Sequence, residues 1–92
     1  MIYLDEKDMK ILKDILRHYP YDFYAHGSRV KGTHQKYSDL DICIIGDISD
    51  EQLVQLRGEL EESNLTVIVD LIKYNDINEE FKNSIQNDLQ KI

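Results

Sequence analysis

Apolar residues recur along the chain at two different spacings, and these spacings predict alternating helices and strands. In residues 5–18 they recur every three or four positions, as in a helix with one buried face, and Asp5 is suited to cap its first turn. Pro20 ends this helix, because the residue before a proline is pushed out of the helical region. Residues 22–25, short and aromatic, follow as a strand.

Two later stretches are predicted to be strands of a buried sheet. Residues 40–45 and 65–72 are rich in β-branched and aliphatic side chains. Between them, Ser49 opens a helix, and its spacing to Gln52 is that of a capping box. An apolar stripe at helical spacing then predicts a last helix over residues 77–92, with Asp76 and Glu79 at its start.

This alternation predicts a small α/β (α+β) domain that spans residues 1–92, with a mixed sheet of at least three strands covered by helices. A chain of 92 residues has no room for a second core of normal size. No apolar run approaches the roughly 18 residues that a membrane span needs. The N-terminus is acidic where a secretory signal would be basic, so the cytoplasm is the expected compartment.

Charge and cysteine content exclude several classes of function. The chain has 18 acidic residues against 11 Lys and Arg, for a net charge of −7. Direct binding of DNA or RNA is therefore not expected, because a general nucleic-acid binder needs a basic face. The single cysteine, Cys43, excludes an internal disulfide and a cysteine-based zinc site, and we expect it to be a small buried apolar side chain.

Three aspartates form the candidate chemical centre. Side chains of a strand alternate between its faces, so Asp39 and Asp41 project to the same side, away from the apolar face of residues 40–45. Asp70 lies in the middle of the apolar segment VIVDLI, where an unpaired carboxylate is energetically unfavourable. If the two strands are neighbours, the three carboxylates meet, and a divalent cation such as Mg²⁺ would relieve their repulsion.

The same aspartates also have a purely structural interpretation. Asp39 could begin a strand, Asp41 could face water, and Asp70 could mark an exposed strand end. The spacing of the acids alone does not decide between these two interpretations.

The segment ahead of the acidic strand favours a phosphate-binding function. Residues 23–38 contain no acid, and they carry five basic side chains: His26, Arg29, Lys31, His34 and Lys36. Gly27 lets a phosphate approach the backbone, and Ser28 offers a hydroxyl at the turn into a short helix that it could cap. The two histidines are expected to be surface or loop residues. A P-loop is excluded, because Thr33 and His34 follow Gly32 in place of Lys and Ser or Thr.

The run AHGSRVKGTHQKYSDLDICI resembles the signature of the nucleotidyltransferase superfamily that includes DNA polymerase β. That signature has Gly-Ser, a ten-residue spacer and Asp-x-Asp, which correspond here to Gly27-Ser28, residues 29–38 and Asp39-Leu40-Asp41. Asp70 matches the third carboxylate of the family. The resemblance covers nearly the whole chain and implies the nucleotidyltransferase fold.

In its length the chain resembles the minimal nucleotidyltransferase (MNT) antitoxins. This resemblance implies transfer of AMP from ATP to a tyrosine of a HEPN-domain toxin. It also implies that Asp39, Asp41 and Asp70 bind two Mg²⁺ ions and carry the catalysis. Gly27, Ser28 and Arg29 are then the expected nucleotide-binding residues.

Two other functions stay open at this point. The protein could neutralise its toxin by contact, with little or no catalysis, or it could modify a small molecule. Release of pyrophosphate from ATP in the presence of the partner separates catalysis from masking. Small-molecule transfer would need an acceptor pocket that a chain of this length does not readily build.

Overall fold

A computed structural model describes the whole chain, residues 1–92. Its helical segments are α1 (Glu6–Leu16), α2 (Ser28–Lys31), α3 (Asp50–Glu62), the 3-10 turn η1 (Tyr74–Asp76) and α4 (Glu79–Ile85). Its strands are β1 (Asp22–His26), β2 (Leu40–Ile45), β3 (Val69–Lys73) and β4 (Gln90–Lys91). The longest helix, α3, has 13 residues. None of the helices combines the length and the apolar character that crossing a membrane requires.

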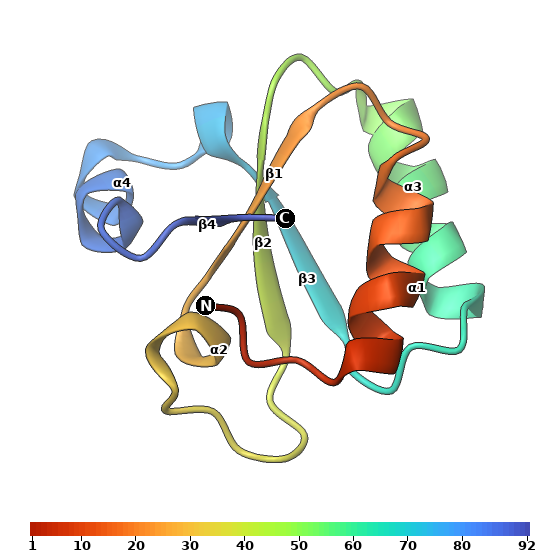
Figure 1. Ribbon diagram of the computed structural model, residues 1–92. Coiled ribbons are helices and arrows are strands. Elements are labelled where there is room, and N and C mark those ends of the chain that lie inside the picture. The colour runs from red at the N-terminus through yellow and green to blue at the C-terminus, as the bar shows by residue number, and fades with distance from the viewer.

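The four strands form one mixed sheet in the order β3-β2-β1-β4 (Figure 1). Strand β1 pairs antiparallel with both β2 and β4, whereas β2 and β3 run parallel. Parallel neighbours need a crossover connection, and α3 supplies it between β2 and β3. The predicted α/β class, a mixed sheet of at least three strands covered by helices, is therefore confirmed.

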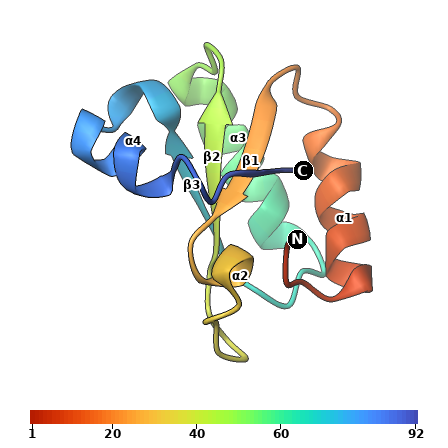
Figure 2. The same cartoon turned by 60° about the vertical axis from the view of Figure 1, so that its left-hand side comes forward.

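The main core lies between the sheet and the helices α1 and α3, which run side by side on one face, while α4 lies beyond the other face (Figure 1 and Figure 2). Leu40, Ile42 and Ile44 point from β2 into this core, as their alternation predicted. The complete cluster consists of Leu12, Leu16, Tyr19, Phe23, Ala25, Leu40, Ile42, Ile44, Ile48, Leu53, Leu56, Leu60 and Leu71. The other face of the sheet carries Asp41, and Cys43 on that face is fully buried, as expected.

Helix α1 begins where the sequence predicted. The carboxylate of Asp5 caps it by accepting a hydrogen bond from the backbone N–H of Lys7 at 2.8 Å. The helix ends at Leu16, and a turn carries the chain to Pro20 and β1.

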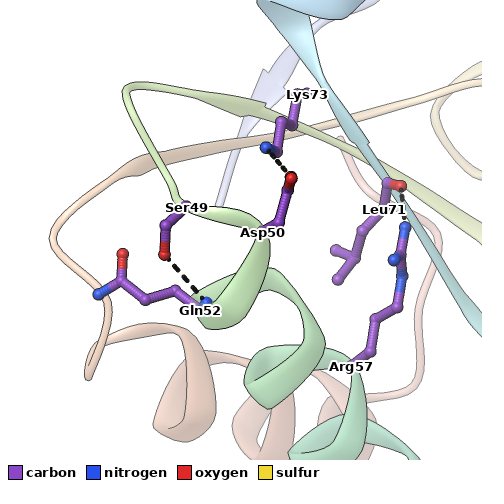
Figure 3. Close-up of polar contacts among 6 residues, drawn as sticks. All are labelled: Ser49, Asp50, Gln52, Arg57, Leu71 and Lys73. Carbon is purple, nitrogen blue, oxygen red and sulfur yellow. Dashed lines mark hydrogen bonds and ion pairs between the residues drawn. The ribbon is translucent and has the colours of Figure 1, made fainter.

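Helix α3 is joined to β3 by two polar contacts (Figure 3). The Lys73 ammonium lies 2.6 Å from the Asp50 carboxylate at the start of the helix, and the Arg57 guanidinium donates to the backbone carbonyl of Leu71 at 3.3 Å. Ser49 caps α3, as predicted, by accepting from the backbone N–H of Gln52. The contacts of Lys73 and Arg57 hold β3, the strand at this edge of the sheet, against α3.

Strand β3 begins at Val69, four residues later than predicted. The reason is a contact with α1, because the Asp8 carboxylate accepts hydrogen bonds from both the backbone N–H and the hydroxyl of Thr66. Asp8 is only 2% exposed, so this pairing also satisfies a buried charge. The polar groups of Thr66 are thus used by a side chain rather than by a neighbouring strand.

The predicted helix over residues 77–92 is correct only in its first half. Helix α4 ends at Ile85, and its cap is Asn78 rather than the expected Asp76, which lies in η1. The Asn78 side chain accepts from the backbone N–H of Phe81 at 2.8 Å. The chain then turns, Gln90–Lys91 pairs with β1, and the N–H of Ile92 donates to the carbonyl of Phe23. This pairing with the open edge of β1 outweighs the helical spacing of the last apolar residues.

Candidate active site

Three polar side chains lie in a row across three neighbouring strands, near one end of each strand. In the strand register, His26 of β1 is opposite Asp41 of β2, and Asp41 is opposite Asp70 of β3. Residues opposite each other on neighbouring strands project to the same face and lie close together. The strands of Asp41 and Asp70 had to be neighbours for the predicted carboxylates to meet, and the structure satisfies this condition.

Asp39 lies directly before β2 and is exposed to solvent. Its negative charge acts on Asp41, which lies between His26 and Asp70 in the row. Partial burial raises the pKa of Asp41 above its usual value, and the negative charges of Asp70 and Asp39 raise it further, against the opposite influence of His26. Asp39 and Asp70 thus both act electrostatically on Asp41.

A cleft of about 320 Å³ opens over this row. One side consists of sheet residues that include His26, Asp41 and Asp70, and the other side comes from α4 and the turn after it. That second side contributes Phe81, Ser84, Ile85 and Asp88. A larger hollow of about 370 Å³ lies between α3 and the segment before β3, but it contains none of the three aspartates.

Gly27 provides the space that the Asp41 carboxylate occupies. Its backbone has φ +81° and ψ −154°, a conformation that essentially only glycine adopts. A β-carbon on Gly27 would lie 2.5 Å from Oδ2 of Asp41, which is closer than real contacts allow. Gly27, and not Ser28 as expected, occupies the cap position of α2, and Ser28 is the first residue of that helix.

Arg29 is buried and supports the loop between the two halves of the motif. Its guanidinium donates hydrogen bonds to the backbone carbonyls of Ser38 at 2.9 Å, Tyr3 at 2.9 Å and Lys36 at 3.2 Å. The side chain is 6% exposed. Each of its three side-chain nitrogens therefore has a carbonyl partner within the chain, and a direct contact of Arg29 with a phosphate stays a prediction.

His26 is the residue of the site that sequence analysis missed. It was expected to be a surface or loop residue, but it is the last residue of β1, only 6% exposed, and it lines the cleft. Burial lowers its pKa, while the negative charges of Asp41, Asp70 and Asp88 act in the opposite direction. The signal that could have found it is the alternation of β1, which places His26 on the face opposite the buried Ala25.

The carboxylates have the right chemistry for a divalent cation but do not form a finished cage. No three His, Cys, Asp or Glu side chains come close enough together to hold a metal ion. Nevertheless, Asp39, Asp41 and Asp70 supply hard oxygen ligands of the type that Mg²⁺ prefers. Mg²⁺ commonly completes its shell with water and substrate phosphate, so a protein site with few ligands fits it.

Comparison with known families gives a match over most of the chain. The profile of the family described as "Nucleotidyltransferase domain" matches residues 8–92. The match includes the Gly27 turn, the acidic strand and Asp70.

A curated relative and a solved structure agree with this match. The "Probable protein adenylyltransferase MntA" of Haemophilus influenzae is 36% identical over 87 residues, which cover 90% of this chain and 76% of that protein. The crystal structure of a "putative nucleotidyltransferase from Sulfolobus solfataricus" superimposes with a TM-score of 0.52 at 18% identity, covering 92% of this chain and 76% of that one. At that level of identity, the second comparison supports the fold alone.

Proposed function

Because the chain belongs to the nucleotidyltransferase domain family, we propose that it transfers AMP from ATP to a hydroxyl group of a partner protein. The observation that carries the proposal is the strand register, which places Asp41 next to Asp70. Because Gly27 has no side chain, the Asp41 carboxylate also lies against the turn into α2. Carboxylates beside a glycine turn suit a triphosphate that arrives with its metal ions.

Asp39 and Asp41 would hold two Mg²⁺ ions, with Asp70 as a further ligand. When bound, such ions neutralise the triphosphate and stabilise the entering and leaving oxygens of an in-line displacement. Asp70 would also orient the acceptor hydroxyl. The hydroxyl oxygen bonds to the α-phosphorus, the bond from that phosphorus to the bridging oxygen breaks, and pyrophosphate leaves. The hydroxyl proton passes to the Asp70 carboxylate or to water.

The turn of Gly27 and Ser28 would bind the β- and γ-phosphates. Gly27 allows the phosphates to approach the backbone, and Ser28 offers its hydroxyl. Lys31 also lines the cleft, and its ammonium lies 3.5 Å from the Asp88 carboxylate. A partly exposed ion pair of this kind is weak, so Lys31 can exchange Asp88 for a phosphate. Arg29 would act by holding the turn in place.

The acceptor would be a tyrosine of a HEPN-domain toxin in the cytoplasm, which makes this protein the antitoxin. The relative from Haemophilus influenzae is named as a protein adenylyltransferase, which supports a protein as the acceptor. The chain's net charge of −7 suits a protein partner with basic groups better than direct contact with nucleic acid.

The experiment that tests this function uses the toxin encoded by the neighbouring reading frame. The purified toxin is incubated with this protein, ATP and Mg²⁺, and its intact mass is measured together with the pyrophosphate released. We expect the toxin to gain one or more AMP groups, with one pyrophosphate released for each. An unmodified toxin and no pyrophosphate would contradict the proposal. Neutralisation of the toxin under those conditions would instead indicate masking by contact.

A further inference from the structure

One buried polar atom in the cleft has no partner within the chain. Nε2 of His26 is shielded from solvent and makes no hydrogen bond. The residue as a whole is 6% exposed. Leaving a buried donor or acceptor unpaired is unfavourable, so such atoms are uncommon in folded proteins.

The position of the imidazole connects this atom to the site. His26 lies opposite Asp41 in the strand register, directly before the Gly27 turn, and lines the same cleft as Asp70. On its other side it packs edge to face against Phe81 of α4, with 6.1 Å between the ring centroids. Phe81 is 40% exposed, so the ring that packs against the imidazole is itself at the surface.

Packing alone does not explain a histidine here. An apolar ring would fill the same space against Phe81 without leaving a nitrogen unpaired. An imidazole carries an N–H donor and, in its neutral form, an acceptor nitrogen as well. The unpaired nitrogen therefore has the chemistry to hydrogen-bond a polar ligand that enters beside Asp41.

We propose that His26 is a nucleotide-binding residue whose Nε2 hydrogen-bonds an oxygen of ATP, on a phosphate or the ribose, when the nucleotide occupies the cleft. This inference rests on the proposed function. The nucleotide is favoured over the acceptor because His26 adjoins Gly27, the first residue of the expected phosphate-binding turn. Because Nε2 is shielded in the free protein, side chains around the imidazole must shift when the nucleotide binds.

The test compares the binding of ATP with Mg²⁺, without any acceptor, by titration calorimetry in three variants. His26→Phe keeps a ring but removes both nitrogens, and we expect about tenfold weaker binding, the ratio that corresponds to one hydrogen bond of about 1.4 kcal/mol. His26→Gln retains an N–H near the position of Nε2 and should recover most of the affinity. Tyr24→Phe, two residues earlier in β1, is the matched control and should bind as the wild type does.

Unfolding by urea without nucleotide separates this role from a structural one. We expect His26→Phe to be at least as stable as the wild type, because it removes an unpaired buried polar atom. A less stable variant that still binds ATP normally would overturn the proposal, as would equal ATP affinity in a stable variant. The proposal would also be overturned if His26→Phe bound ATP normally and lost only the transfer to an acceptor, because His26 would then contact the acceptor.

A measurement on the wild type does not depend on how the variants fold. With ¹⁵N-labelled histidine, the Nε2 signal of His26, assigned by its absence in His26→Gln, should move when ATP and Mg²⁺ are added. An unmoved signal at saturating ATP would overturn the proposal. If the wild type binds no ATP at all, the proposed function fails first, so the two failures are distinguishable.

Discussion

A β-carbon on Gly27 would lie 2.5 Å from Oδ2 of Asp41, so the side chain that glycine lacks is replaced by a carboxylate oxygen of the neighbouring strand. Gly27→Ala should therefore strain the turn, by about 1–3 kcal/mol of unfolding free energy, and displace Asp41. We expect the rate of AMP transfer to fall by at least about tenfold, because small displacements of reacting groups are costly.

Gly58→Ala is the matched control for this prediction. Gly58 lies inside α3, and a β-carbon there would meet nothing within 4 Å. The substitution should raise the unfolding free energy by about 0.5–1 kcal/mol and leave transfer unchanged. Equal effects of the two substitutions, measured by urea unfolding and transfer rate, would argue against the contact between Gly27 and Asp41.

Arg29 should act on activity through stability and loop position. Arg29→Lys keeps the charge, but a single ammonium nitrogen cannot reach the carbonyls of residues 3, 36 and 38, which three different nitrogens of the guanidinium bond. We expect a loss of about 2–4 kcal/mol in unfolding free energy, from two or more buried acceptors left unpaired. Lys10→Ala, which removes an exposed ion pair with Asp14, should change stability by less than about 1 kcal/mol.

A direct phosphate contact by Arg29 predicts a different result. In that case Arg29→Lys would weaken ATP binding while leaving the urea midpoint in place. Measuring both quantities on the same variant decides between the two roles.

Asp70→Asn should lower the rate of transfer strongly without weakening the fold. Asp70 raises the pKa of its neighbour Asp41, so its removal relieves repulsion between like charges. We expect unfolding free energy to stay the same or rise, and the transfer rate to fall by a factor of about 10² or more. Asp76→Asn in the exposed turn η1 is the control, and wild-type transfer by Asp70→Asn would make Asp70 a structural residue.

Tyr19 gives a pH dependence that is independent of the site. Burial, together with its hydrogen bond to Glu59 at 2.8 Å, raises the pKa of Tyr19 to about 12 from 10.0. The unfolded chain therefore releases this proton first as the pH rises. The contribution of Tyr19 to stability is complete below about pH 10 and is lost as the pH rises toward 12.

Urea unfolding between pH 8 and 11 tests this prediction by comparing the wild type with Tyr19→Phe. The stability difference between the two proteins should shrink toward the alkaline end of that range. Tyr37→Phe, at a position that is 78% exposed, should show no such trend. A difference that stays constant with pH would contradict the assignment.

The parts of the fold that depend on local pattern could be predicted from the sequence. Strand β2 has the predicted bounds, Leu40–Ile45, because its apolar residues alternate in a β-branched run with a clear end at Gly46. The caps Asp5 and Ser49 were correct because a capping side chain bonds its own first turn.

The errors arose where distant residues compete with local preference. Asp8 is 58 residues from Thr66 in the sequence, so its effect on the start of β3 could not be predicted from local pattern. The last apolar stripe was predicted to be helical, but the edge of β1 was available to Gln90–Lys91 only in the folded chain.

In the candidate site, too, local sequence patterns were recognisable, whereas contacts between distant residues were not. The spacing of Gly27, Asp39 and Asp41 was recognisable because it lies within one continuous segment. Arg29 was expected at a phosphate because of its positive charge, and its carbonyl partners could not be foreseen because they come together only on folding. His26 was missed because its burial depends on α4, a helix more than fifty residues away in the sequence.

The central claim is that Asp39, Asp41 and Asp70 together carry AMP transfer. Its most direct test is the double substitution Asp39→Ala with Asp41→Ala, assayed by mass spectrometry of the toxin after incubation with ATP and Mg²⁺. Asp47→Ala, an exposed acid in the turn after β2, serves as the control. We predict no detectable AMP on the toxin with the double variant and normal transfer with the control. Full AMP transfer by the folded double variant would contradict the account.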